Sequence, residues 1–276
     1  MYDLHSHLLP GIDDGAPDYE TSLAMARAFA EQGVQCVACT PHILPGLYYN
    51  TGPQIKKAVT ELRLRIEDAG IPLQIVPGAD NHIVPDFVGG LKRGNLLPIG
   101  DSSYVLVEPP HHVAPTRLEE LFFGILLGGY IPILTHPERL SWIEHKYDVV
   151  TRLAAKGVWM QITSGSLCGR FGRRPRYWAE RMLEEGLVHI IATDAHNMSS
   201  RPPDLSEGYA KAERLVGTEE ARHLVVTRPY GALVNTPPRE LPPPSPGAPD
   251  RQLPEDDNRK AAQAGGRSKR RWRLFG

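Results

Sequence analysis

The amino-acid sequence predicts an α/β fold built on a parallel sheet, in a barrel of the (β/α)7 or (β/α)8 kind. Seven short runs rich in β-branched residues alternate with longer amphipathic stretches. The short runs are apolar along nearly their whole length, as are strands of a sheet covered on both faces. This pattern fills about 235 residues, which suits one barrel. A doubly wound open sheet is the alternative.

The predicted elements follow one another in regular order. The strands are expected at residues 2–5, 34–40, 73–78, 104–108, 131–135, 158–163 and 189–193. The helices show apolar residues at helical spacing and are expected at residues 18–32, 53–69, 116–128, 141–156 and 175–185. Gly33, Gly70, Gly157 and Gly186 end four of them. The leucine and aromatic residues of 118–129 are expected to pack in the core.

Composition and charge restrict the class of protein. The chain is 41% hydrophobic and 23% charged, which excludes a wholly disordered protein. No run reaches the roughly 18 apolar residues of a membrane span, and no segment resembles a signal peptide, so a cytoplasmic location is expected. Three cysteines form no disulfide framework, which agrees with a reducing compartment. Oligomeric state is not predicted.

The sequence changes character after Thr236. Residues 237–254 contain eight prolines in eighteen positions, and a charged run ending RSKRRWRLFG follows. Such a segment cannot bury a core, so we expect a domain of residues 1–236 and a disordered, Pro-rich, basic tail of residues 237–276. An alternative role for the tail is peripheral contact with an anionic membrane surface or an acidic partner, through its Arg/Lys cluster with Trp272 and Phe275.

The predicted domain is mildly acidic and the tail is basic. Nine of the 31 Lys and Arg residues and five of the 32 Asp and Glu residues lie after Thr236, which leaves a net charge of -5 on residues 1–236 and +4 on the tail. Binding to a phosphate backbone needs a basic face. Nucleic acid is therefore not expected as a partner.

Metal-capable side chains follow the predicted strands at their carboxyl ends, the face where active sites of parallel α/β folds are built. They are His5, His7, Asp14, His42, Asp80, Glu108, His136, Asp194 and His196. One such histidine alone is more often a structural or surface residue, but five histidines and four carboxylates from six strands predict a metal centre. Because a catalytic zinc usually takes three protein ligands and a water, this set predicts two or three ions.

The residue types also indicate the chemistry. Imidazoles with carboxylates suit Mn, Fe or Zn better than Ca or Mg. Closely spaced divalent ions lower the pKa of bound water and hold the attacking and leaving oxygens of a phosphoester. Arg139 and Arg201 are the candidate catalytic cations, because a guanidinium can bind two phosphoryl oxygens at once. The residues therefore predict metal-dependent hydrolysis of a phosphoester.

Five motifs stand in a specific order: DLHSHLLPGIDDGA, CTPH, THPER, TSGSLCGRFG and TDAHN. In this order they resemble the PHP (polymerase and histidinol phosphatase) superfamily. Specifically, they are similar to its bacterial CpsB-type branch, the manganese-dependent protein-tyrosine phosphatases of capsule and exopolysaccharide loci. The similarity covers residues 1 to about 236. It implies a distorted (β/α)7 TIM-like barrel and Mn²⁺ as the preferred metal, with Fe or Zn as alternatives.

The resemblance also implies individual roles. One metal would be held by His5, His7, Asp80 and Asp194, a second by Asp80, Glu108 and His136, and a third by Asp14, His42 and His196. A metal-activated hydroxide would attack phosphorus in line, with Arg139 and Arg201 holding the phosphoryl oxygens. The implied substrate is a phosphotyrosine protein, typically the tail of a bacterial tyrosine kinase that controls polysaccharide synthesis.

One position departs from the family pattern. The family usually has Glu as the bridging carboxylate in a GxE sequence, whereas this chain has Asp80 in GAD. Because Asp is one methylene shorter, metal occupancy and turnover are affected more than the class of reaction. We expect Asp80→Glu to preserve or raise activity, and a large loss would show a pocket rebuilt around Asp.

The cysteines offer a competing mechanism. Cys168 and Arg174 match the C-x5-R pattern of cysteine-dependent tyrosine phosphatases, in which a thiolate is the nucleophile. Leu167 stands where that pattern usually has His, and a thiolate mechanism leaves the metal-capable residues unexplained. Cys36 and Cys39 have redox or zinc spacing, but they lie in an apolar strand with side chains on opposite faces, so burial is expected.

Three further functions stay open within this framework. They are a phosphatase for histidinol phosphate or a sugar phosphate, a phosphodiesterase, and a non-catalytic adaptor that holds a kinase tail in a weakened metal site.

Overall fold

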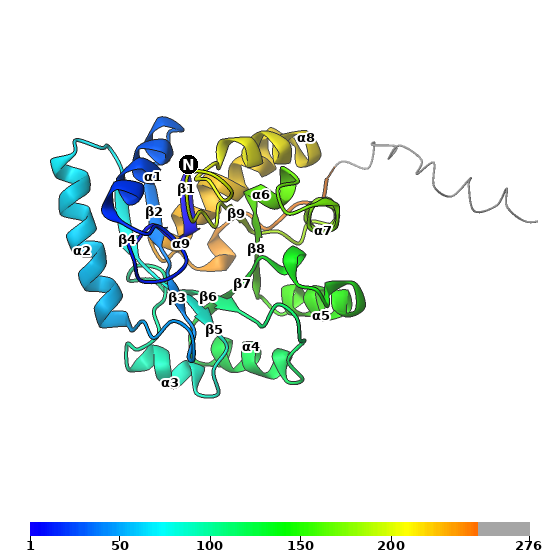
Figure 1. Ribbon diagram of the computed structural model, residues 1–276. Helices are drawn as coiled ribbons and strands as arrows, with labels where there is room; N and C mark the ends of the chain where they lie inside the picture. The colour runs from blue at the N-terminus through cyan, green and yellow to red at the C-terminus, as the bar shows by residue number, and fades with distance from the viewer. Residues whose placement is uncertain (248–276) are drawn as a thin grey trace, which may run out of the picture.

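The computed structural model describes residues 1–247 (Figure 1). The strands in this part of the chain are β1 (Tyr2–Ser6), β2 (Cys36–Cys39), β3 (His42–Ile43), β4 (Gln74–Pro77), β5 (Asp80–His82), β6 (Tyr104–Glu108), β7 (Ile131–Thr135), β8 (Trp159–Thr163) and β9 (Ile190–Ala192). The helices are α1 (Tyr19–Glu31), α2 (Gly52–Asp68), α3 (Phe87–Lys92), α4 (Leu118–Leu127), α5 (Ile143–Ala155), α6 (Ser164–Leu167), α7 (Arg173–Glu184), α8 (Ser206–Arg222) and α9 (Arg228–Leu233). No helix within residues 1–247 is long and apolar enough to span a membrane.

All pairings between these strands are parallel. One sheet has the order β1-β2-β4 and the other the order β3-β5-β6-β7-β8-β9. The last strand meets the first through a bridge between Ser6 and Ala195 and through hydrogen bonds from His7 N to Ala195 O and from Asp194 N to His5 O, both 2.8 Å. The sheet therefore curls, and the helices lie around its outside (Figure 1). The predicted α/β fold with a parallel sheet is confirmed.

Two of the predicted strands are interrupted. Within the range predicted at 34–40 the structure has β2, and a second short strand, β3, follows two residues after it ends. Within the range predicted at 73–78 it has β4, and β5 likewise follows two residues later. Pro41 has no N–H to give to a sheet ladder, and Gly78 lies so close to Thr40 that an added Cβ would be 3.0 Å from Thr40 Cγ2. Beyond the interruption, His42 pairs in register with Asp80, so both chemically important residues lie on strand rather than loop.

The helices α3, α6, α8 and α9 lie outside the predicted set. The first two are short, and α8 contains Gly217 in a left-handed conformation (φ 83°), which breaks the helical periodicity in the sequence. The five predicted helices are all present, with ends displaced by a few residues.

Side-chain alternation along β6 explains how the core gives way to the site. Tyr104 and Leu106 belong to a buried cluster that draws on β1, β2, β6, β7, β8 and β9 and therefore fills the space that the curled sheet encloses. Glu108 is two residues further along and points the same way, because side chains of a strand alternate between its two faces. The apolar interior thus ends in a layer of polar side chains at the carboxyl ends of the strands.

The predicted tail begins too early. Residues 237–247 lie against the domain: the buried Arg228 side chain donates from Nε to Pro242 O (2.8 Å) and from Nη2 to Pro243 O (2.9 Å). Gly247 N donates to Glu184 O on α7 (3.1 Å). Proline-rich composition suggested a mobile segment, but its carbonyl groups serve as acceptors for a buried cation. The remainder of the predicted tail, 248–276, lies outside the described residues.

Candidate metal centre

The nine predicted metal-capable residues come together at the carboxyl ends of the strands. Ligand atoms that lie within 4.8 Å of one another form the groups His7–Asp14–His42–His196, His5–His7–Asp80, His5–His136–Asp194, His42–His82–Glu108 and Glu108–His111–His136. Every predicted ligand belongs to at least one group. Segments far apart in the sequence, from the first strand to the loop after β9, therefore supply one centre.

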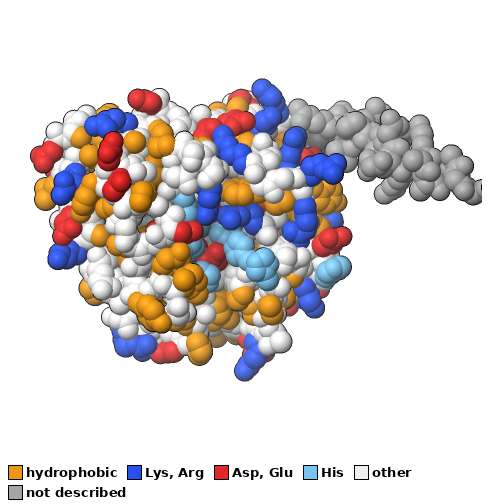
Figure 2. Space-filling model, in the orientation of Figure 1, with side chains coloured by type: hydrophobic (Ala, Val, Ile, Leu, Met, Phe, Trp, Pro, Cys, Tyr) orange, Lys and Arg blue, Asp and Glu red, His pale blue; other side chains and the backbone are white. Residues whose placement is uncertain are grey.

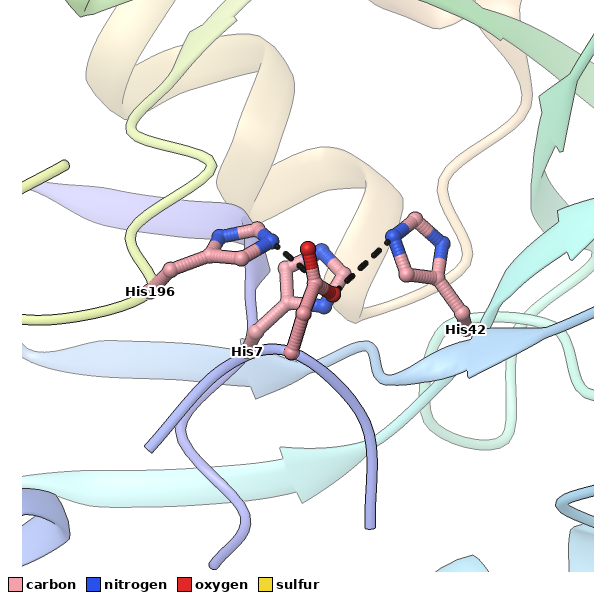
Figure 3. Close-up of side chains that lie close together, drawn as sticks. His7, His42 and His196 are labelled. Carbon is pink, nitrogen blue, oxygen red and sulfur yellow. Dashed lines mark ion pairs between the residues drawn. The ribbon is translucent and has the colours of Figure 1, made fainter. Parts of the chain in front are cut away.

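The outermost group contains Asp14 and three histidines, His7, His42 and His196, whose rings are shown in Figure 3. Oδ1 of Asp14 lies 3.5 Å from Nε2 of His42 and 3.5 Å from Nε2 of His196. The centroid of the His7 ring lies 3.8 Å from that of the His196 ring. Asp14 is 46% exposed, so this group opens to solvent. The three residues predicted to share one metal are adjacent.

A deeper group contains His5, His7 and Asp194. Nε2 of His5 and Nε2 of His7 lie 3.3 Å apart, and they lie 3.4 and 3.3 Å from Asp194 Oδ1. Two ligands that each lie about 2.1 Å from one ion, at angles between a right angle and the tetrahedral angle, are about 3.0–3.4 Å apart. The observed spacing is close to that of a coordination shell.

Several buried polar atoms of the centre have no hydrogen-bond partner. They are both carboxylate oxygens of Asp80, Oε2 of Glu108, Nδ1 of His42, Nδ1 of His136 and Nε2 of His196. Burial and Glu108 act to raise the pKa of Asp80, but His5 and His42 hold it below its usual range, so the buried carboxylate is charged. Unpartnered buried groups of this kind are costly, and coordination of a cation satisfies them. The residues present fit divalent metal ions.

Glu108 has two histidine neighbours that the sequence did not single out. Its Oε1 lies 3.0 Å from Nε2 of His111 and 3.5 Å from Nε2 of the predicted ligand His136, while its Oε2 contacts Nε2 of His82. The available signals were the position of His82 two residues after Asp80 and of His111 three residues after Glu108.

Two further polar residues fix the orientation of the first histidines. Asp13 Oδ2 lies 2.7 Å from Nδ1 of His7, and Gln161 Oε1 lies 2.8 Å from Nδ1 of His5. Each contact occupies Nδ1 and leaves Nε2 directed at the centre, the usual role of outer partners of metal-binding histidines. Asp13 lies outside the predicted set; it accepts from Gly15 N and also orients His7.

Both predicted arginines reach one carboxylate. Nη1 of Arg139 and Nη2 of Arg201 each lie 2.5 Å from Oδ2 of Asp194, whose other oxygen faces the histidines. Burial acts to raise the pKa of Asp194, but Arg201, His5 and Arg139 hold it well below its usual range. Figure 2 shows basic side chains gathered directly beside the histidines that reach the surface.

The surrounding loop and an aromatic ring hold the arginines in place. Asn197 Oδ1 accepts hydrogen bonds from the backbone N–H groups of Ser199, Ser200 and Arg201, which curls the loop back toward Asp194. The guanidinium of Arg139 lies 4.4 Å above the ring of Phe171.

Comparison with known proteins identifies the family. The family described as "Capsular polysaccharide synthesis, CpsB/CapC" matches residues 1–234. The chain is 37% identical over 219 residues to the tyrosine-protein phosphatase YwqE of Bacillus subtilis, across 79% of this chain and 86% of that protein. It is 29% identical over 240 residues to the tyrosine-protein phosphatase CpsB of Streptococcus pneumoniae, across 85% and 99%. The chain belongs to the CpsB/CapC family.

A solved structure that matches the CpsB/CapC chain supports the same family assignment. It is described as "Crystal structures of YwqE from Bacillus subtilis and CpsB from Streptococcus pneumoniae, unique metal-dependent tyrosine phosphatases". The match has a TM-score of 0.84 and 35% identity, and it covers 90% of this chain and 100% of the solved one. The predicted resemblance to the CpsB-type branch is confirmed.

The cysteines of the CpsB/CapC chain do not form a nucleophilic site. Burial and the Glu207 carboxylate raise the pKa of Cys168 to about 11, so the thiol stays protonated at neutral pH. Arg174 donates to the carbonyl oxygens of Leu140 and Ser141. Cys36 and Cys39 are buried, as predicted.

Two residues of the CpsB/CapC centre have a left-handed backbone. His136 has φ 33° and Asp194 has φ 52°, and both carry a Cβ that makes this conformation unfavourable. Each directly follows or nearly follows a strand, and the turn aims its side chain inward. Strain of this kind is characteristic of functional sites.

Proposed function

We propose that the chain is a metal-dependent protein-tyrosine phosphatase that hydrolyses phosphotyrosine at the centre described above. The observation that carries this is the convergence of nine metal-capable side chains beside two arginines that meet at Asp194. The relatives named tyrosine-protein phosphatase support the substrate class. The fold is proposed as a distorted (β/α)7 barrel in which β2 with β3, and β4 with β5, each count as one interrupted strand.

The proposed ligands divide into three sets, and Mn²⁺ is the proposed metal, with Fe or Zn as alternatives. His5, His7, Asp80 and Asp194 would hold one ion, Asp80, Glu108 and His136 a second, and Asp14, His42 and His196 a third. When bound, divalent ions supply Lewis acidity and lower the pKa of water.

The protein's own groups orient the substrate. Arg139 and Arg201 each use one nitrogen on Asp194 and keep further N–H donors for phosphoryl oxygens. Their positive charge favours the transition state, in which charge develops on those oxygens. Asp13 and Gln161 keep Nε2 of His7 and His5 directed at the centre. The group around Asp14 faces solvent, which gives a phosphotyrosine side chain access.

The proposed partner is a phosphotyrosine segment of a bacterial tyrosine kinase, in keeping with the family's description as capsular polysaccharide synthesis proteins. A cytoplasmic location is proposed because all three cysteines are free. Contact of the basic residues 248–276 with an anionic membrane also stays a proposal.

The decisive experiment combines metal analysis with a substrate panel. Hydrolysis of a phosphotyrosine peptide, phosphoserine, histidinol phosphate and a phosphodiester is measured before EDTA, after EDTA and after Mn²⁺ is restored. We expect phosphotyrosine to be preferred, EDTA to abolish activity and Mn²⁺ to restore it. Preference for histidinol phosphate or the diester would contradict the proposal in favour of those alternatives, and tight binding of the peptide without hydrolysis would favour an adaptor.

Variants of the arginines test their role. We expect Arg139→Ala and Arg201→Ala each to lower kcat by about 10²–10³-fold, the usual effect of losing one transition-state donor. Arg173→Ala, an exposed arginine at the start of α7, serves as the control. Wild-type kcat in both site variants would show that these side chains only support Asp194.

A further inference from the structure

Glu108 lies among four imidazoles. Its Oε1 lies near Nε2 of His111 and of His136, and its Oε2 lies near Nε2 of His82 and 3.3 Å from Nδ1 of His42. The rings on each side are also close, with centroids 5.4 Å apart for His42 and His82 and 5.0 Å apart for His111 and His136. Each oxygen of this carboxylate therefore belongs to its own group of potential ligands.

The strand register explains why His82 is near Glu108 while Asp80 is not grouped with it. In the parallel ladder of β5 and β6, His82 pairs with Glu108, whereas Asp80 pairs with Leu106. The backbone of Asp80 is also fixed on its other side, by pairing with His42 on β3. Among residues 1–247, the ligand groups place Asp80 with His5 and His7 and not with Glu108 and His136. Because Asp is one methylene shorter than Glu, its carboxylate reaches less far across this offset, although Oδ2 of Asp80 and Oε2 of Glu108 both lie near Nδ1 of His42, at 3.4 and 3.3 Å.

His111 and His82 contact different oxygens of Glu108: Nε2 of His111 lies within hydrogen-bond distance of Oε1, at 3.0 Å, and Nε2 of His82 contacts Oε2. Oε2 of Glu108 is buried and has no hydrogen-bond partner, although imidazole nitrogens of His82 and His42 lie beside it. A buried carboxylate oxygen beside two imidazole nitrogens offers three ligand atoms of the kinds that a shared divalent cation binds.

We propose that His82 and His111 are metal ligands that act with Glu108 and take over the place that a longer carboxylate at position 80 would fill. This rests on the proposed occupation of the centre by divalent ions. It adds a property of this chain: the ligand set around Glu108 is richer in imidazole because Asp80 is short.

The test measures bound Mn²⁺ by equilibrium dialysis and elemental analysis, in two backgrounds. In the parent chain, we expect the double variant His82→Ala with His111→Ala to lose about one ion, or to bind it at least tenfold more weakly. In an Asp80→Glu background, we expect the same double change to leave occupancy near the level of Asp80→Glu alone. His112→Ala is the matched control, because His112 is exposed and adjoins His111.

Pulsed EPR of the Mn²⁺-loaded protein adds a direct readout of nitrogen ligands. We expect nitrogen coupling to decrease in the double variant and to stay unchanged in His112→Ala. Gln variants at both positions, together with circular dichroism, separate ligand loss from unfolding. Full Mn²⁺ content and unchanged coupling in the double variant would overturn the proposal, and equal losses in both backgrounds would overturn the replacement of Asp80.

The outcome is independent of the proposed enzymatic activity. If the chain binds Mn²⁺ through His82 and His111 but does not hydrolyse phosphotyrosine, the proposed function fails and the ligand set stands. If it hydrolyses phosphotyrosine while the double variant keeps its ions and its nitrogen coupling, the ligand set fails and the proposed function stands.

Discussion

Asp13 and Asp14 are neighbours in the chain but have different tasks. Asp14 is half-exposed and lies between two imidazoles, whereas the buried Asp13 side chain holds Nδ1 of His7 at 2.7 Å. We expect Asp13→Ala to weaken Mn²⁺ affinity by about 10–100-fold, the usual effect of losing an outer partner of a ligating histidine. Calorimetric titration with Mn²⁺ measures this affinity, and Asp68→Ala, a change at an exposed residue, is the control. Unchanged affinity would show that packing alone orients His7.

Cys168 tests the competing mechanism at a single atom. Since its thiol has a pKa of about 11, we expect Cys168→Ser to keep activity within about twofold of the parent, because a protonated thiol is a poor nucleophile. Steady-state hydrolysis of a phosphotyrosine peptide measures it, alongside a sample treated with EDTA. Loss of activity in the Ser variant together with resistance to EDTA would restore the thiolate mechanism.

Some of the site residues could be predicted from the sequence and others could not, for a physical reason. His5, His42 and Glu108 were predictable because each lies at or just past the carboxyl end of a recognisable strand. His82 and Gln161 were not, because their relevance depends on cross-strand neighbours: His82 pairs with Glu108, and Gln161 meets His5 from 156 residues away. Which residues of two parallel strands lie opposite each other depends on how distant parts of the chain assemble, and the residues around one strand do not show it.

At the scale of elements, strand positions were predictable and strand interruptions were not. Apolar β-branched runs located every major strand, because a sheet buried on both faces needs them. The breaks at Pro41 and Gly78 depend on how two neighbouring strands pass each other, and they place His42 opposite Asp80. Gly217 likewise hid α8, because its positive φ divides the element into two helical segments that meet at a kink.

His189, the residue directly before β9, makes the stability of the fold depend on pH. Its ring stacks on Trp159, its Nδ1 accepts from Met160 N, and burial followed by the charge of Arg228 lowers its pKa from 6.5 to about 3. The unfolded chain takes up this proton near pH 6.5, but the folded chain does not. The contribution of His189 to stability is therefore present above pH 6.5 and is lost as the pH falls toward 3, by up to about 1.4 kcal/mol per pH unit.

Urea unfolding at pH 7.0 and pH 5.5 measures this coupling. We expect the free energy of unfolding of His189→Gln to fall less between these values than that of the parent, because Gln can still accept from Met160 N and does not titrate. Parallel declines in the two proteins would show that other groups carry the acid sensitivity.

For the whole molecule, residues 237–247 complete the fold. They supply two carbonyl acceptors to Arg228, whose fully buried guanidinium also pairs with Glu220. Composition could not reveal this, because prolines that favour a mobile chain also present carbonyl groups with no N–H of their own. The carbonyl groups of Pro242 and Pro243 contribute to stability only because α9 places the buried Arg228 guanidinium beside them.

Two truncations test this role of the segment. A chain that ends at Gly247 is expected to melt within about 1 °C of the full chain, whereas a chain that ends at Thr236 is expected to melt at least about 2 °C lower. Losing partners of a buried charged group costs about 1–3 kcal/mol, and 1 kcal/mol shifts Tm by about 2–4 °C at this size. Calorimetry with and without Mn²⁺ measures it. Equal Tm values for the two truncations would show that the segment only rests on the surface.

The left-handed backbone at His136 and Asp194 lowers the stability of the metal-free protein but directs two candidate metal ligands into the centre. A Cβ in this conformation costs about 1–2 kcal/mol at His136 and less at Asp194, because Asp tolerates it better, and this cost has to be offset by surrounding contacts or by a bound cation. Metal-free His136→Asn should therefore unfold at higher urea than the metal-free parent, since Asn tolerates this conformation; a lower midpoint would contradict this. In relatives that are selected for stability but no longer for metal binding, we expect these two positions to change first. Such relatives would lose metal-dependent activity and keep the fold.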